Sequence, residues 1–181
     1  MNKIILSTIA LCLAGIGCTT TDPDSEATSM QQRQDPPPAT QAWMDRLTVD
    51  HAYDPETGFI VARETVPLPA VIAEGPSLDR AVEDADGRIV IAFATADRCA
   101  PCQQYKLDAL NNGLVIARLE DPTFVVTHVE VDRQGELAER YLGSRGIPMT
   151  YALRDGEQIA VLRGQRSADD LLAWLEQLDA G

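Results

Sequence analysis

Three features of the sequence predict an α/β fold with a central mixed sheet flanked by helices. "RIVIAFA" (88–94) is a continuous apolar run of strand length, as expected for a strand buried on both faces. Helical patterns alternate with this run and with a second β-rich run, "TFVVTHVEV" (123–131), which implies parallel strands joined by right-handed crossovers. Asp155-Gly156 separates two further strand patterns and signals a tight hairpin, which adds an antiparallel edge.

The elements of this domain, residues 76–181, can be placed in order along the chain. Ser77 is a good N-cap for a first helix, "SLDRAVEDA", which precedes the strand at 88–94. A second helix should run over 100–110 and break at "NNG" (111–113). "GELAERYL" (135–142) is a short helix between the second strand and the hairpin. The last helix follows Ser167 as its cap and carries an apolar stripe suited to the core: Leu171, Leu172, Trp174, Leu175 and Leu178.

Residues 1–17 form a targeting segment. Lys3 gives a positive start, and the apolar run over 4–17 is short for a membrane-spanning helix but typical of a signal peptide. The run ends in "LAGIGC", and polar sequence begins directly after Cys18. This segment resembles a bacterial lipoprotein signal, which implies that Cys18 is lipidated and becomes the mature N-terminus. Gly15 departs from the aliphatic residue usual in that signal, and cleavage nearby or an uncleaved anchor are the alternatives.

The lipoprotein resemblance also implies an address. Thr19 follows the cysteine where, in many Gram-negative bacteria, Asp would signal retention in the inner membrane. We therefore expect an exported, membrane-anchored protein that faces the periplasm, at the outer membrane if the host is Gram-negative.

Between the signal and the domain lie two segments of different character. Residues 18–42 are dominated by Pro, Asp, Gln, Ser and Thr without apolar periodicity, which predicts a lipid-anchored disordered linker. "DPPP" (35–38) within it should be extended and stiff. Residues 43–75 form an N-terminal extension, in which "WMDRL" fits one helical turn and "GFIVAR" (58–63) a short strand.

The charge of the chain limits its partners. The formal net charge is −13, whereas binding to nucleic acid or to an anionic membrane surface needs a basic patch, and the sequence has none. We therefore expect no nucleic-acid partner, and membrane attachment through the lipid on Cys18 alone.

"DRCAPCQQYK" (97–106) places Cys99 and Cys102 in a CxxC pair, which fits a metal site, a structural link or a redox centre. Structural zinc needs four ligands, and beyond the pair the chain offers only His51 and His128, so no metal is predicted. Cu(I) binding by the two thiolates and a third ligand remains an alternative.

The local sequence suits redox chemistry. Cys99 should lie at the start of a helix, where free N–H groups and the helix dipole stabilise a thiolate. Pro101 fits the first turn because no N–H is needed there, and Cys102 lies one turn on, close enough to attack a mixed disulfide at Cys99. Arg98 adds a positive charge beside the pair, which Asp97 partly offsets.

Three stretches resemble thioredoxins over about residues 76–179. "IVIAFATADRCAPC" is similar to the thioredoxin active-site strand and turn, "SRGIPMTYALRDGEQIAVLRG" to its Gly-Ile-Pro-Thr strand and hairpin, and "SADDLLAWLEQL" to its last helix. The resemblance implies a thioredoxin fold in which Cys99 is the attacking thiol and Cys102 the resolving thiol. It implies that Pro148 is a cis-proline facing the pair, and it places Ile147 where reducing thioredoxins also carry Ile.

The sequence also departs from the thioredoxin pattern. Arg98 replaces the usual Trp, Ala-Pro replaces Gly-Pro, and one extra residue lies near Ala94. The buried acid of the family falls at Ala92, and His128 lies where the family carries the lysine paired with that acid. With an ordinary pKa of about 6.5, His128 would be suited to relay protons; alternatively, it fills the face of its strand.

These observations together predict an extracytoplasmic thiol–disulfide oxidoreductase, in the reducing direction, that acts on protein disulfides. Nothing in the sequence binds NADPH or flavin, so no cofactor is predicted and a membrane redox partner should reset the pair. A copper-handling chaperone and a redox-inactive thioredoxin-like binding module are the alternatives. Reduction of apocytochrome c is a narrower possibility that no feature singles out.

Overall fold

The computed structural model describes residues 35–179. The predicted signal peptide, Cys18 and most of the predicted linker lie outside the described residues. All of the described residues belong to one compact unit.

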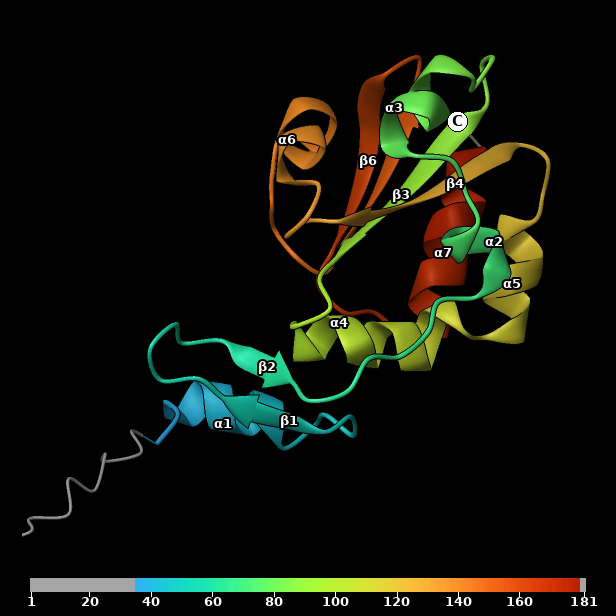
Figure 1. The fold of residues 1–181 in the computed structure, drawn as a ribbon. Helices are drawn as coiled ribbons and strands as arrows, with labels where there is room; N and C mark the ends of the chain where they lie inside the picture. The colour runs from blue at the N-terminus through green and yellow to red at the C-terminus, as the bar shows by residue number, and fades with distance from the viewer. Residues whose placement is uncertain (1–34, 180–181) are drawn as a thin grey trace, which may run out of the picture. The chain divides into compact units, whose positions relative to one another are not determined.

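A four-stranded sheet forms the centre of the fold, with the strand order β4-β3-β5-β6 (Figure 1). β3 (Ile89–Thr95) and β4 (Phe124–Glu130) are parallel. β5 (Met149–Arg154) is antiparallel to both of its neighbours, β3 and β6 (Glu157–Arg163). Every residue of β3 is buried, as its continuous apolar run predicts. The predicted mixed sheet with an antiparallel edge is confirmed.

Helices cover both faces of the sheet (Figure 1). On one face, Val90, Ala92 and Tyr151 share a core with α3 (Leu78–Glu83) and with the segment η2 (Ala138–Leu142), which follows α6 (Gly135–Leu137). On the other face, Ile91 and Phe93 share a core with three helices: α2 (Ala70–Ala73), α5 (Gly113–Leu119) and α7 (Ala168–Asp179).

The helix that follows β3 is less regular than predicted. α4 (Ala100–Tyr105) continues as a π-helical segment, η1 (Lys106–Leu110), and the Asn111 N–H donates to the Lys106 carbonyl over 3.0 Å. The predicted break at 111–113 is confirmed, because the Asn112 side chain caps α5. The segment predicted as one helix over 135–142 likewise changes from α6 into a π-helical segment, η2 (Ala138–Leu142).

The end of the domain follows the sequence signals closely. Asp155 and Gly156 have positive φ angles of 54° and 80°, as a two-residue type I′ hairpin requires. The Ser167 hydroxyl accepts a hydrogen bond of 3.1 Å from the Asp170 N–H, which confirms the predicted cap of α7.

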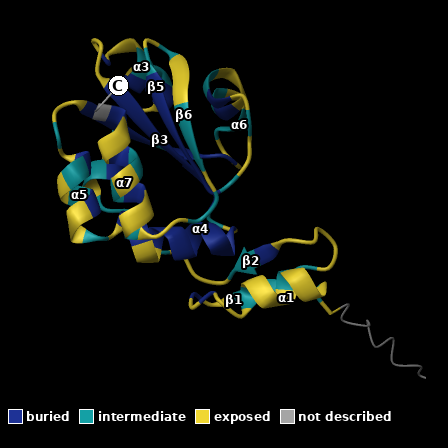
Figure 2. Ribbon diagram, turned by 180° about the vertical axis from the view of Figure 1, so that it is seen from behind, coloured by how far each residue is buried: buried dark blue, intermediate teal, exposed yellow. Residues whose placement is uncertain are grey.

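The N-terminal extension is more structured than predicted. It contains α1 (Pro38–Met44) and a small antiparallel sheet of β1 (His51–Tyr53) and β2 (Ile60–Ala62). The prediction of disorder is therefore wrong for residues 38–42, because Pro38 starts a helix at a position where its fixed φ and missing N–H are tolerated. Figure 2 shows α1 as largely exposed and α4 as buried.

Candidate active site

The CxxC pair lies where β3 leads into α4. Cys99 and Cys102 form a disulfide with Cα atoms 5.2 Å apart. Cys99 is the N-cap of α4, and the Cys102 N–H donates to its sulfur over 3.2 Å. The predicted position at the start of a helix is confirmed. After reduction, this amide and the helix dipole would stabilise a negative charge on the Cys99 sulfur.

The two sulfur-bearing residues differ in accessibility. Cys99 is 9% exposed, whereas Cys102 is 0% exposed. Cys99 also lines a cavity of about 460 Å³, together with Pro101 and Ile147. An incoming disulfide can therefore approach Cys99 but not Cys102.

The loop before β5 completes this side of the site. The Ile147–Pro148 peptide bond is cis, as the thioredoxin resemblance implied. Pro148 is buried, and its carbonyl accepts a hydrogen bond of 3.0 Å from the Gly164 N–H. The structure thus brings Ile147 to the same cavity as Cys99, although 48 residues of sequence separate them.

Arg98 lies beside the disulfide, but Asp97 does not offset its charge. The Arg98 guanidinium makes two hydrogen bonds to the Asp132 carboxylate, of 2.7 and 3.0 Å. This pairing raises the pKa of Arg98. The guanidinium also lies 5.1 Å from the centre of the Phe59 ring. Asp132 is therefore the partner that sequence analysis missed.

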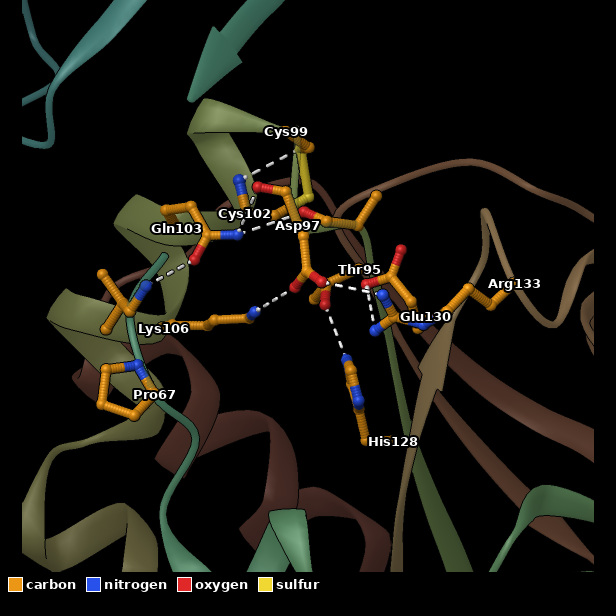
Figure 3. Close-up of polar contacts among 12 residues, drawn as sticks. Pro67, Thr95, Asp97, Cys99, Cys102, Gln103, Lys106, His128, Glu130 and Arg133 are labelled. Carbon is orange, nitrogen blue, oxygen red and sulfur yellow. Dashed lines mark hydrogen bonds and ion pairs between the residues drawn. A yellow bond between two sulfur atoms is a disulfide. The ribbon is translucent and has the colours of Figure 1, made fainter. Parts of the chain in front are cut away.

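Asp97 belongs instead to a group of polar side chains behind the disulfide, which we call the inner cluster (Figure 3). Asp97 Oδ1 lies 3.7 Å from Lys106 Nζ, and Asp97 Oδ2 lies 3.0 Å from Arg133 Nη1. Lys106 is only 3% exposed, and this burial lowers its pKa, while Asp97 and then Glu130 oppose the shift. The cluster comprises six side chains: Thr95, Asp97, Lys106, His128, Glu130 and Arg133.

His128 occupies the inner cluster as a neutral ring. Its Nε2 atom lies 2.7 Å from the Thr95 hydroxyl. Burial, and then the charge of Lys106, lowers the pKa of His128 to about 4. The pKa of His128 is thus below the ordinary value of about 6.5, so the imidazole stays neutral between about pH 6 and 8. Whether it relays a proton stays a prediction.

Glu130 is the buried acid of this cluster. Burial, and then the neighbouring charge of Asp97, raises the pKa of its carboxyl group. Among the described residues, no group donates a hydrogen bond to its Oε2 atom, although Arg133 lies 4.0 Å away. The inner cluster therefore has a buried acid, Glu130, at the end of β4, whereas the acid of the thioredoxin family was expected on the strand that is β3 here.

The position expected for the family's acid, Ala92, lies on the other face of the sheet. In the parallel register, His128 is paired with Phe93, and Ala92 is paired with Thr127. Side chains alternate between the faces of a strand, so Ala92 cannot replace a partner of His128. In this register Phe93, one residue further along β3 than Ala92, is the residue beside His128.

Two glutamines after the CxxC pair bind the N-terminal extension to α4. The Gln104 carbonyl accepts hydrogen bonds from the N–H groups of Thr48 and Val49, at 2.7 and 3.1 Å. The Gln103 carbonyl accepts one from the Val66 N–H at 2.8 Å. Both side chains are buried. The only signal in the sequence was their place in an otherwise apolar face of the helix, and it did not reveal their partners.

The extension also contacts the CxxC turn directly. The Ala62 N–H donates to the Arg98 carbonyl over 2.8 Å, and Val61 forms an isolated antiparallel bridge with Cys99. Trp43 and Phe59 line the same cavity as Cys99. Sequence analysis assigned no role to these residues.

The described part of the chain has neither a cluster of metal ligands nor a membrane-spanning helix. Among residues 35–179, no three His, Cys, Asp or Glu side chains gather as a metal site would require. Within the same range, no helix has the length and apolar character needed to span a membrane.

Comparison with known proteins identifies the family of the domain. The family model of the thioredoxin-like domain matches residues 77–179. A thioredoxin from Thermus thermophilus is 32% identical over 57% of this chain and 84% of its own, with a TM-score of 0.49. A mutant thioredoxin from Halobacterium salinarum is 28% identical over 57% and 85% of the two chains, with a TM-score of 0.44. The comparison with curated proteins found no match.

The sheet, the disulfide at the start of α4 and the cis peptide bond beside it define a thiol–disulfide oxidoreductase with a CxxC active site. The chain belongs to the thioredoxin-like domain family.

Proposed function

We propose that this protein reduces disulfides of other proteins outside the cytoplasm. The Cys99 thiolate attacks one sulfur of a substrate disulfide, forming a mixed disulfide and releasing the other substrate sulfur as a thiolate. Cys102 then loses its proton and attacks the Cys99 sulfur, which releases the second substrate thiolate. Two electrons and the Cys102 proton pass to the substrate, whose second thiolate takes its proton from water according to the pH, and the Cys99–Cys102 disulfide forms again. A membrane redox partner must return the two electrons.

One observation carries the proposal: the disulfide joins a reachable sulfur, that of Cys99, to a fully buried one, that of Cys102. Only Cys99 lines the cavity where a substrate can approach. Ile147, which precedes Pro148 in a cis peptide bond, also lines this cavity, and in this proposal Pro148 faces the reacting sulfur.

Trapping experiments test the two roles. The Cys102→Ser variant should accumulate a mixed disulfide with a substrate protein, because nothing resolves it, and Cys99→Ser should trap nothing. Equal trapping by both variants would overturn the roles. The reduction potential of the pair tests the direction of electron transfer. A value of about −270 mV supports a reductant, and a value of about −120 mV indicates an oxidant. A stoichiometric Cu(I) complex with slow disulfide exchange would indicate metal handling instead.

The proposed location rests on the sequence of residues 1–19. In this proposal the signal is removed, a lipid on Cys18 attaches the protein to a membrane, and the domain faces the periplasm, at the outer membrane in a Gram-negative host. Cys18→Ala should release the protein from the membrane fraction and leave disulfide exchange in vitro unchanged. Unchanged membrane association would indicate an uncleaved anchor.

A further inference from the structure

The cavity beside Cys99 has two walls of different origin, and we call it the dithiol groove. The thioredoxin-like domain supplies one wall, which includes Pro101 and Ile147. The N-terminal extension supplies the other, with Trp43 from α1, Phe59 just before β2, and Ile60 at the start of β2. The family model begins at residue 77, so this second wall lies outside the family's own domain.

The second wall presents aromatic surface to the groove. The side chains of Trp43 and Phe59 are 41% and 54% exposed. Three other large apolar side chains of the described residues, Leu107, Leu114 and Ile159, are also exposed, but none of them lines the groove. Single exposed apolar side chains are ordinary, whereas two aromatic rings beside a reactive sulfur form a surface that a ligand can cover.

The wall is fixed to the active-site helix. The buried Gln103 and Gln104 side chains accept hydrogen bonds from three backbone N–H groups of the extension. Gln104 also donates to the Thr48 hydroxyl over 3.0 Å and to Asp108 over 2.9 Å, so its amide is fully engaged. On the other side, β2 pairs with the Arg98–Cys99 backbone. Phe59 is therefore held at a set position relative to Cys99.

We propose that Trp43 and Phe59 select the substrate: they bind a large apolar side chain of a polypeptide, next to the half-cystine that Cys99 attacks. The inference rests on the proposed function, because the occupant must bring a disulfide to Cys99. Apart from the Thr40 hydroxyl, the uncharged lining is apolar, and the two charged residues, Arg98 and Arg145, are already paired with Asp132 and Glu139. The groove therefore favours an apolar segment over a charged one.

The test compares three disulfides in reaction with the reduced full-length protein. Two are synthetic peptides of equal length with one internal disulfide, flanked by Leu and Phe in the first and by Ser and Asn in the second. The third is oxidised glutathione, which has no apolar side chain to bind. We expect the wild-type protein to reduce the apolar peptide about tenfold faster than the polar one, since burial of one large side chain is worth about that factor.

Variants then locate the source of this preference. The double variant Trp43→Ser/Phe59→Ser should lose the preference, so that it reduces the apolar and the polar peptide at similar rates, and its rate with oxidised glutathione reports any change in the dithiol itself. Phe59→Leu should keep most of it, because an apolar contact remains. Leu114→Ser is the matched control, since Leu114 is 70% exposed but lies on α5 outside the groove, and it should behave as wild type.

Several results would overturn the inference. One is survival of the preference in the double variant, and another is an equal fall in all three rates, which would indicate damage to the dithiol. A wild-type dimer that dissociates on Phe59→Ser would show that a second copy covers the wall. If the wild-type protein reduces none of the three disulfides, the proposed function fails as well, and that result is distinct from a loss of preference alone.

Discussion

The two sides of the Cys99–Cys102 disulfide differ in chemistry. The dithiol groove on the Cys99 side is apolar and open, with its outer wall supplied by the N-terminal extension. The inner cluster is charged: its Thr95, Lys106 and Glu130 side chains are buried, whereas Asp97 and Arg133 reach the surface (Figure 3). This difference separates two tasks: changes in the groove should alter which substrates react, and changes in the cluster should alter stability and its dependence on pH.

The largest expected effect comes from the inner cluster. Asp97→Asn removes the carboxylate that lies between Lys106 and Arg133, and Lys106 is almost fully buried. Because Asp97 itself is partly exposed, we expect a loss of about 2–3 kcal/mol in the free energy of unfolding, measured by urea denaturation. Asp50→Asn is the control, since the Asp50–Arg63 pair is exposed and should contribute less than about 0.5 kcal/mol.

Phe59→Ser in the groove sharpens the comparison. The Phe59 side chain is more than half exposed, so its loss should change the free energy of unfolding by no more than about 0.5 kcal/mol. Equal losses in Asp97→Asn and Phe59→Ser would contradict the division between the two sides.

The pH dependence of stability gives the next largest effect. The pKa of His128 is lowered from 6.5 to about 4 in the folded protein. Between those values the unfolded state takes up a proton that the folded state does not, so stability is lost as the pH falls from about 6.5 to 4. Burial raises the pKa of Glu130, so its contribution changes in the opposite direction and grows as the pH falls.

The variant His128→Gln removes the contribution of His128 to the pH dependence and leaves that of Glu130. Gln can still hydrogen-bond to Thr95, so the variant should match the wild type closely at pH 8. From pH 6.5 to 4 it should lose less stability than the wild type, by about 2 kcal/mol after allowance for partial exposure. Parallel curves for the two proteins over this range, followed by chemical denaturation, would show that His128 does titrate normally.

How far the sequence predicts the structure differs between the domain and the extension. In the domain, each element has a local signal: the apolar run of β3, the Asp155-Gly156 turn, the Ser167 cap. These signals act over a few residues, so they can be read without knowing the fold. The cysteine pair was found in the same way, because its residue types and spacing are themselves the signal, whereas the cis form of Pro148 was implied only by the thioredoxin resemblance.

The remaining features depend on contacts between distant parts of the chain. Gln104 meets Thr48 across 56 residues, and Arg98 meets Asp132 across 34 residues. The periodicity of apolar residues within one helix or strand does not predict such a contact between distant residues. The assignment of Ala92 failed for a different reason: a shift of one residue moves a side chain to the other face of a strand, so small alignment errors reverse a structural conclusion.

The contact between the two regions can be broken at Gln104. Gln104→Leu removes the acceptor for the Thr48 and Val49 N–H groups, and we expect a loss of about 1–2 kcal/mol. Hydrogen exchange should accelerate at both amides while the amides of β3 stay protected. Gln41→Leu is the control, because Gln41 bonds only to exposed Asp45 in the described structure. Unchanged exchange at Thr48 and Val49 would show that other contacts hold the extension.

The smallest expected effect concerns the charge beside Cys99. Arg98 was expected to favour the Cys99 thiolate, but its guanidinium is paired with Asp132, which cancels most of that influence. Asp132→Asn should therefore leave Arg98 uncompensated and increase the alkylation rate of reduced Cys99 by iodoacetamide below pH 7, by about twofold to threefold. Arg98→Gln should decrease this rate by a similar factor, because Asp132 then acts alone. The double variant should return close to the wild-type rate.

Arg80→Gln in α3, at the end of the sheet away from α4 in Figure 1, serves as the control. If Arg98→Gln and Asp132→Asn shift the rate in the same direction, the pair acts through the position of the CxxC turn and not through its charge.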